Sequence, residues 1–162
     1  MEQDTSLRVR GIQWVEIIAI ILSLCGVIIF IGGAISVANS QTSSFNAPIW
    51  PLPGLVLTYW AILGIVHLVF TILIAMDKPN IFLYGSWSIT GAFIPLMILG
   101  ALSIGSIVLM GFVLFLFSSI LLSLRRKVKW LTSLGLFILG AVISAGVLLA
   151  MIALWNPQFF AN

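Results

Sequence analysis

One long uncharged stretch decides how this chain folds: Ile81–Leu124, which reads IFLYGSWSITGAFIPLMILGALSIGSIVLMGFVLFLFSSILLSL. As a single α-helix it would extend ~66 Å, about twice the thickness of the hydrocarbon core of a bilayer. Two spans joined by a turn would fit, and we expect that turn near 100–106, where glycine and serine cluster. The alternative is a broken or re-entrant segment within 81–124, buried in protein. Pro95 is expected to bend the third helix.

Apolar runs on both sides of this stretch are also long enough to cross a bilayer. The sequence therefore predicts an all-α integral membrane protein, a single domain over 1–162 built as a bundle of five transmembrane helices. The spans are expected at about 13–37, 55–76, 81–99, 104–124 and 130–155. Residues 38–54, rich in serine and proline, are predicted to form a loop. The first run is longer than the core of a usual signal peptide, so an uncleaved span is expected.

The composition agrees with a protein whose main solvent is lipid. The chain is 62% hydrophobic and 7% charged, whereas a soluble domain has about 25% charged residues. The net charge of +3 is small and gathered in short groups, without the basic stripe or aromatic platform of a nucleic-acid-binding surface. We therefore expect the lipid bilayer as a partner and no nucleic acid.

The cations predict the orientation of the spans. All seven flank the apolar runs in three groups, which should lie on one side of the membrane; they are Arg8 and Arg10, Lys78, and then Arg125, Arg126, Lys127 and Lys129. Lys and Arg in short loops stay in the cytoplasm. The N-terminus is therefore expected to be cytoplasmic and the C-terminus outside. The cluster at 125–129 is interpreted as a topology anchor that contacts lipid headgroups, with a lipid-phosphate site as the alternative.

The six tryptophans are expected at the two membrane interfaces, where an amphipathic ring is most stable. The inner belt would hold Trp14, Trp87 and Trp130, and the outer belt Trp50, Trp60 and Trp155.

Two ionisable residues inside the spans are the candidates for chemistry. His67 is the only histidine and lies within the second span. It could ligate a haem, bind a quinone or relay protons, or it could be a neutral imidazole that joins helices by hydrogen bonds. A single histidine cannot ligate both faces of a haem, so a haem or quinone would be shared with a partner. Glu16 is a candidate for a proton or ion pathway, or an interfacial acid paired with Arg10 or with the 125–129 cluster.

Small residues mark the expected helix contacts, because they let backbones approach closely in lipid. On the second span they include Ala61 and Gly64, and on the fifth they are Gly140, Ala141, Ser144 and Ala145. The fifth span carries small residues around much of its circumference. It is therefore expected to be central in the bundle or to face another subunit.

The function predicted from these features is a non-catalytic small integral membrane subunit, which scaffolds or lines a larger complex such as an energy-converting one. Other membrane subunits or further copies of the chain are the expected partners. One alternative is a small oligomeric transporter or channel; another is a haem- or quinone-binding redox protein that uses His67. The sequence contains no phosphate loop, CxxC pair or zinc motif. We therefore expect no enzyme activity of its own.

Overall fold

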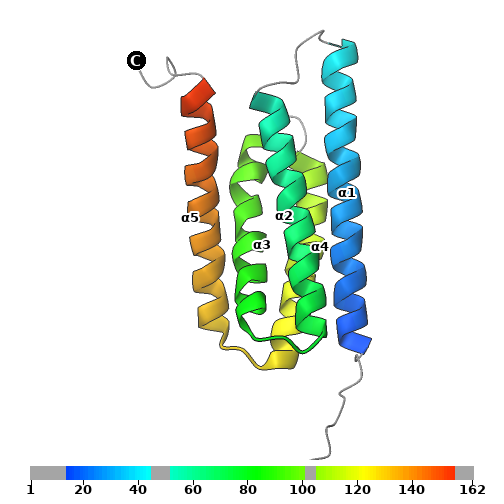
Figure 1. Ribbon diagram of the computed structural model, residues 1–162, viewed down its shortest axis with the longest axis vertical. Coiled ribbons are helices and arrows are strands. Elements are labelled where there is room, and N and C mark those ends of the chain that lie inside the picture. Colours follow the sequence, from blue (N-terminus) through cyan, green and yellow to red (C-terminus); the bar gives the residue numbers. More distant parts are fainter. Residues whose placement is uncertain (1–13, 45–51, 101–104, 156–162) are drawn as a thin grey trace, which may run out of the picture.

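The computed structural model describes residues 14–44, 52–100 and 105–155, and these form an all-α membrane bundle (Figure 1). Its helices are α1 (Trp14–Ser44), α2 (Leu52–Ala75), α3 (Ile81–Gly100), α4 (Gly105–Arg126) and α5 (Trp130–Trp155). All five are long and apolar enough to cross a membrane. The predictions made for the proline-rich segment around Trp50 and for the tail after residue 155 lie outside the described residues.

The uncharged stretch forms two helices, as the sequence predicted. Helix α3 is continuous over Ile81–Gly100 and α4 over Gly105–Arg126, so neither part of the stretch is a broken segment. The residues that join them, 101–104, are not described. Pro95 lies inside α3, and the bend expected there stays a prediction.

Helix α1 is longer than predicted, and this corrects the loop expected at 38–54. The helix continues to Ser44, and α2 already begins at Leu52. The stretch between Gly33 and Pro48 contains neither glycine nor proline, and its serine, asparagine and threonine residues each weaken a helix by less than ~1 kcal/mol. Pro53 lies in the first turn of α2, where a backbone N–H has no partner within the helix. At ~46 Å, α1 exceeds the thickness of the hydrocarbon core.

Two residues with positive φ end helices sharply on one side of the bundle. Asp77 has a φ of 60° and Lys127 a φ of 50°. The amide of Lys78 donates to the carbonyl of Leu73 at 3.1 Å, and the amide of Val128 donates to the carbonyl of Ser123 at 3.3 Å. These are the 6→1 bonds of Schellman caps, which allow α3 and α5 to begin after very short turns.

Both turns lie at the lower end of the bundle in Figure 1, where α1 also begins. We call this the charged end. It carries every cation that the described residues contain: Lys78, Arg125, Arg126, Lys127 and Lys129.

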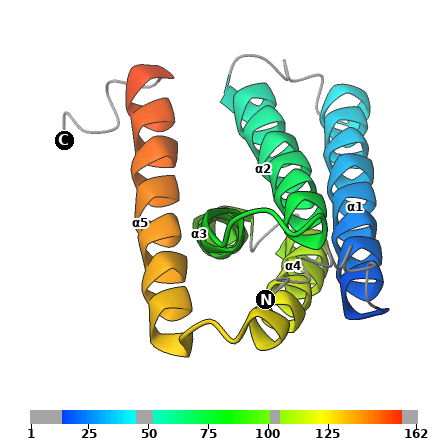
Figure 2. The ribbon, with the colours of Figure 1, turned by 60° about the horizontal axis from the view of Figure 1, so that its bottom comes forward.

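Helices α1 to α4 pack around a common core, whereas α5 packs mainly along α3 (Figure 2). Helix α5 lies on the side of α3 that faces away from α1. In an 18-residue apolar stretch of α5, only 17% is buried inside the protein. The corresponding stretches of the other four helices are 33% to 44% buried. Of the two positions expected for this helix, the central one was therefore wrong, and the position that faces another subunit stays a prediction. Some of its small residues form a close contact with α3, and much of the rest of its surface is exposed.

Two of the tryptophans are buried inside the protein. Trp60 is 1% exposed and Trp87 3% exposed, whereas Trp14 and Trp130 are mostly exposed. The indole N–H of Trp87 donates to Ser123 Oγ at 2.7 Å, which satisfies its polar edge away from water. Trp60 packs against Phe30 with ring centroids 4.9 Å apart. Both rings are therefore shielded from lipid by the core that they fill, and their depth relative to the membrane interfaces stays a prediction.

Candidate functional site

A buried polar cluster around His67 joins four helices. Its imidazole, on α2, is fully buried. Ser23 Oγ on α1 lies 2.9 Å from Nδ1. On the other side of the ring, Ser86 Oγ on α3 and Ser119 Oγ on α4 lie 3.0 and 3.1 Å from Nε2. Each of the four helices therefore contributes at least one polar side chain to one connected cluster, which we call the His67 cluster: Ser23, His67, Ser86, Thr90 and Ser119.

The tautomer of the His67 ring follows from the number of hydroxyl hydrogens that the cluster can donate. Thr90 donates to the carbonyl of Ser86 at 2.8 Å, so its oxygen can only accept from Ser119, 3.2 Å away. Ser119 must then accept from Ser86 at 2.7 Å, and the Nε2–H of His67 is shared between the oxygens of Ser86 and Ser119. A neutral histidine carries one N–H, so Nδ1 accepts from Ser23. Every hydroxyl then donates once, in one direction around the cluster.

Aromatic rings close the cluster on the side away from the charged end. The ring of Phe115 lies 4.4 Å from that of His67, centroid to centroid. Phe93 stacks on Phe115 at 5.3 Å, and Phe30 contacts both at 4.7 and 5.2 Å. All three phenylalanines are fully buried. A neutral imidazole suits this setting, because a charged one inside the membrane would lose its hydration without gaining an adjacent anion.

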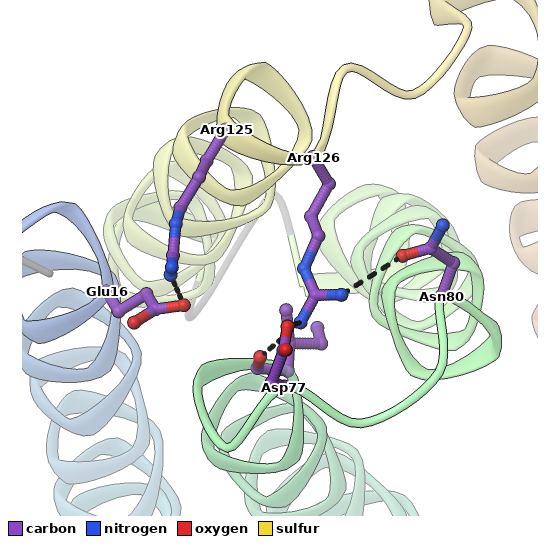
Figure 3. Close-up of polar contacts among 6 residues, drawn as sticks. Glu16, Asp77, Asn80, Arg125 and Arg126 are labelled. Carbon is purple, nitrogen blue, oxygen red and sulfur yellow. Dashed lines mark hydrogen bonds and ion pairs between the residues drawn. The ribbon is translucent and has the colours of Figure 1, made fainter. Parts of the chain in front are cut away.

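A second polar site holds the helices together at the charged end (Figure 3). Glu16 on α1 forms an ion pair with Arg125 on α4, and their side chains are 2% and 13% exposed. This is a pairing of Glu16 with the 125–129 cluster, one of the two arrangements expected for an interfacial acid. A buried carboxylate gains from such a partner because neither charge is then left alone in a low dielectric.

The neighbouring arginine closes the turn between α2 and α3 (Figure 3). Arg126 Nη2 lies 2.9 Å from the carboxylate of Asp77 and donates to the carbonyl of Ile74 at 2.7 Å. The Nη1 group donates to Asn80 Oδ1 at 3.5 Å. Both arginines of the predicted headgroup cluster are thus engaged within the protein, while Lys127 and Lys129 are exposed.

The contact between α3 and α5 is built on small residues, some of which were expected at a helix interface. A side chain at Gly140 would collide with the carbonyl of Ser88, and one at Gly91 with the carbonyl of Phe137. Ser144 donates to the carbonyl of Ala92 at 2.8 Å. Ser88 returns a bond across the same contact, to the carbonyl of Leu136 at 3.2 Å. At Gly140 and Ser144, the backbone of α5 therefore lies directly against the backbone of α3.

The other predicted packing residues lie at looser positions. Ala141 is partly buried beside this contact. Ala145 lines an apolar groove of about 270 Å³ between α3 and α5. Gly64 faces Phe30: a Cβ atom added at this glycine would lie 3.3 Å from the phenylalanine ring. Ala61 lines a groove of about 410 Å³ between α1 and α2. Small residues in these helices therefore mark both close contacts and lateral grooves.

Sequence reasoning found His67 but not the serines that bind it. Serine is common in membrane helices and usually bonds within its own helix, so Ser23, Ser86 and Ser119 do not stand out. A weak signal exists: each lies between about one and a half and two and a half turns from the charged end of its helix, not far from the depth of His67. The similar depth of these residues becomes informative only when it is known which end of each helix lies at the charged end.

No protein-family model matches this chain, and neither the curated proteins nor the solved structures contain a significant match to it.

Proposed function

We propose that the chain is a non-catalytic, small integral membrane subunit that scaffolds or lines a larger membrane complex. The observation that carries the proposal is the position of α5. This helix packs closely on α3 and leaves most of its apolar surface outside the bundle. In a membrane, such a surface is available to the helices of other subunits or of further copies of the chain.

The bonding of the His67 cluster supports a structural use of the histidine. Both ring nitrogens are within hydrogen-bond distance of serine hydroxyls, and the ring packs against Phe115. A haem ligand or a quinone donor would need one of these nitrogens. The bonds instead tie α1, α2, α3 and α4 together, and a fixed core is what a scaffold requires.

The proposed orientation places the charged end in the cytoplasm and the C-terminus outside. The support is that all cations of the described residues lie at one end of the bundle, as the distribution of Lys and Arg in membrane proteins favours.

The test is isolation of the chain from native membranes in mild detergent, followed by identification of co-purifying proteins and a visible absorption spectrum. Val142 is 64% exposed on α5, and Val142→Trp should reduce co-purification while the bundle stays intact. The matched control is Ile28→Trp on α1, where the replaced residue is 61% exposed. A stable, colourless chain that purifies alone would contradict the proposal, and a haem spectrum would favour the redox alternative.

A further inference from the structure

A small pocket at the seam of α2, α3 and α5 is lined by three residues that carry hydroxyl groups. Helices α2 and α5 flank α3 (Figure 2), and the pocket, of about 170 Å³, lies where the three meet. Tyr59 comes from α2, Ser88 from α3 and Ser144 from α5, and the other described lining residues are apolar. A mostly apolar pocket with a few convergent polar groups is typical of a ligand site between the helices of a bundle.

The hydrogens of all three hydroxyls are already used within the protein, and that of Tyr59 is donated to Ser144 Oγ, 3.2 Å away. Ser144 in turn donates to the carbonyl of Ala92 at 2.8 Å. Ser88 donates to the carbonyl of Leu136 at 3.2 Å. A hydroxyl carries one hydrogen and two lone pairs, so these oxygens can still accept a hydrogen bond but have no hydrogen left to donate. The pocket therefore suits a group that donates hydrogen bonds.

The three hydroxyls lie deep within the membrane-spanning part of the bundle. Tyr59, Ser88 and Ser144 are each at least seven residues from both ends of their helices, which corresponds to ~10 Å along the helix axis. Lipid tails at this depth offer no hydrogen-bond acceptor, so a hydroxyl dissolved among them has no partner. An oxygen of the pocket would supply one. A charged donor is disfavoured, because no anion is among the described lining residues.

The size and the exposure of the pocket limit what can enter it. Ile143, one of its lining residues, is 57% exposed on α5, and both Tyr59 and Ser88 are partly exposed. At this depth, exposed side chains face lipid, so a ligand would arrive from the bilayer. Pockets that enclose a whole drug-sized molecule measure about 300–1,000 Å³. This smaller pocket therefore admits only one end of a longer apolar molecule.

We propose that the pocket binds the hydroxyl end of a lipid-soluble alcohol, which enters from the membrane and donates a hydrogen bond to the oxygen of Tyr59 or Ser88. The apolar remainder of the alcohol stays in the bilayer. The hydroxyl is the specific element, because a methyl ether of the same molecule has no hydrogen to donate. The proposal is independent of the subunit function, which rests on the outward surface of α5.

The first test compares two photoreactive probes in vesicles that contain the full chain: octanol with a diazirine group, and the methyl ether of the same molecule. The octanol should label Leu63 and Ile89 in the pocket at least about tenfold more than the ether does. An excess of plain octanol should suppress this labelling. Equal labelling by the ether would overturn the need for a donor. Labelling that plain octanol does not suppress would come from alcohol dissolved in the lipid and would overturn the site.

The second test removes the accepting oxygens one at a time. Tyr59→Phe and Ser88→Ala each delete one oxygen, and the variant that loses the accepting one should show at least about threefold less preference for octanol over the ether. Tyr84→Phe is the matched control, because Tyr84 is also partly buried but does not line the pocket. Thermal unfolding reports whether each variant keeps its bundle. An unchanged preference in both Tyr59→Phe and Ser88→Ala would overturn the assignment of the acceptor.

The third test leaves every hydroxyl in place. Ile143→Trp puts a larger ring at an exposed lining position, so the bundle should fold while labelling of Leu63 and Ile89 by the octanol is largely lost. Leu139→Trp is the control, because Leu139 is 50% exposed on α5 but does not line the pocket. Equal labelling in the two variants would overturn the placement of the alcohol in this pocket.

Discussion

At the scale of single residues, the ionisable groups buried in the described helices lie in pairs or clusters rather than alone. His67 has hydroxyl partners on α1, α3 and α4. Glu16 has Arg125, and Asp77 has Arg126. The membrane explains this arrangement, because each polar group that leaves water must find its hydrogen bonds inside the protein. The same logic predicts which substitutions are tolerated.

His67→Gln should retain most of the stability of the bundle, whereas His67→Leu should lose ~1–2 kcal/mol. Glutamine offers an N–H donor and a carbonyl acceptor, the two functions that the donor count assigns to Nε2 and Nδ1. Leucine offers neither and leaves serine hydroxyls without a partner. Thermal unfolding in detergent measures the difference. Equal losses in the two variants would contradict the structural reading of His67, as would a Gln variant that loses function while its complex stays intact.

Glu16→Gln should destabilise the protein by about 3 kcal/mol, because it leaves the largely buried guanidinium of Arg125 without its counter-ion. The matched control is Asp77→Asn. Asp77 also pairs with an arginine, but its side chain is 62% exposed, so the loss should stay below ~1 kcal/mol. The double change Glu16→Arg with Arg125→Glu should recover part of the stability. Similar unfolding midpoints for Glu16→Gln and Asp77→Asn would show that the Glu16 pair is worth no more than an exposed one.

At the scale of elements, the sequence predicts the helices well and their packing poorly. Apolar run length and the places of the cations were enough to divide 81–124 into two helices, and α2 to α5 begin and end within three residues of their predicted limits. The end of α1 was missed because serine and asparagine were read as loop formers, although nothing there breaks a helix. The partners of His67 could not be predicted, since the rotation of each helix about its axis is set by contacts between distant residues.

Gly140→Leu should separate α5 from α3 without unfolding the other four helices. Even a Cβ at this position would overlap the carbonyl of Ser88, so the backbones must move apart and the bonds from Ser88 and Ser144 are lost. Limited proteolysis near the turn at 127–129, together with thermal unfolding, would report the release. Gly146→Leu is the control, because a built Cβ there meets nothing within 4 Å. If both variants behave like the parent protein, the close contact of α3 with α5 is not needed for their association.

At the scale of the whole molecule, one end concentrates charge and the other holds none among the described residues. The described cations and both anions that pair with them lie at the charged end, which the short turns after α2 and α4 complete. Five helices long and apolar enough to cross a bilayer, with α1 starting and α5 ending at opposite ends of the bundle (Figure 1), predict five crossings. An odd number of spans places the two ends of the chain in different compartments, so the orientation can be measured directly.

Single cysteines in a Cys25→Ala background should report that orientation in intact cells. A cysteine at Ser40, exposed near the far end of α1, should react with a membrane-impermeant thiol reagent added outside. Cysteines at Lys78 and Lys127 should react only after the membrane is opened, because positively charged short turns remain in the cytoplasm. Labelling of Lys78→Cys and Lys127→Cys from outside, with Ser40→Cys protected, would keep the fold and reverse its direction. Labelling of Ser40→Cys and Lys127→Cys together from outside would instead require an even number of crossings between them. If Lys78→Cys stayed protected, the hairpin of α3 and α4 could not then span the membrane as two helices.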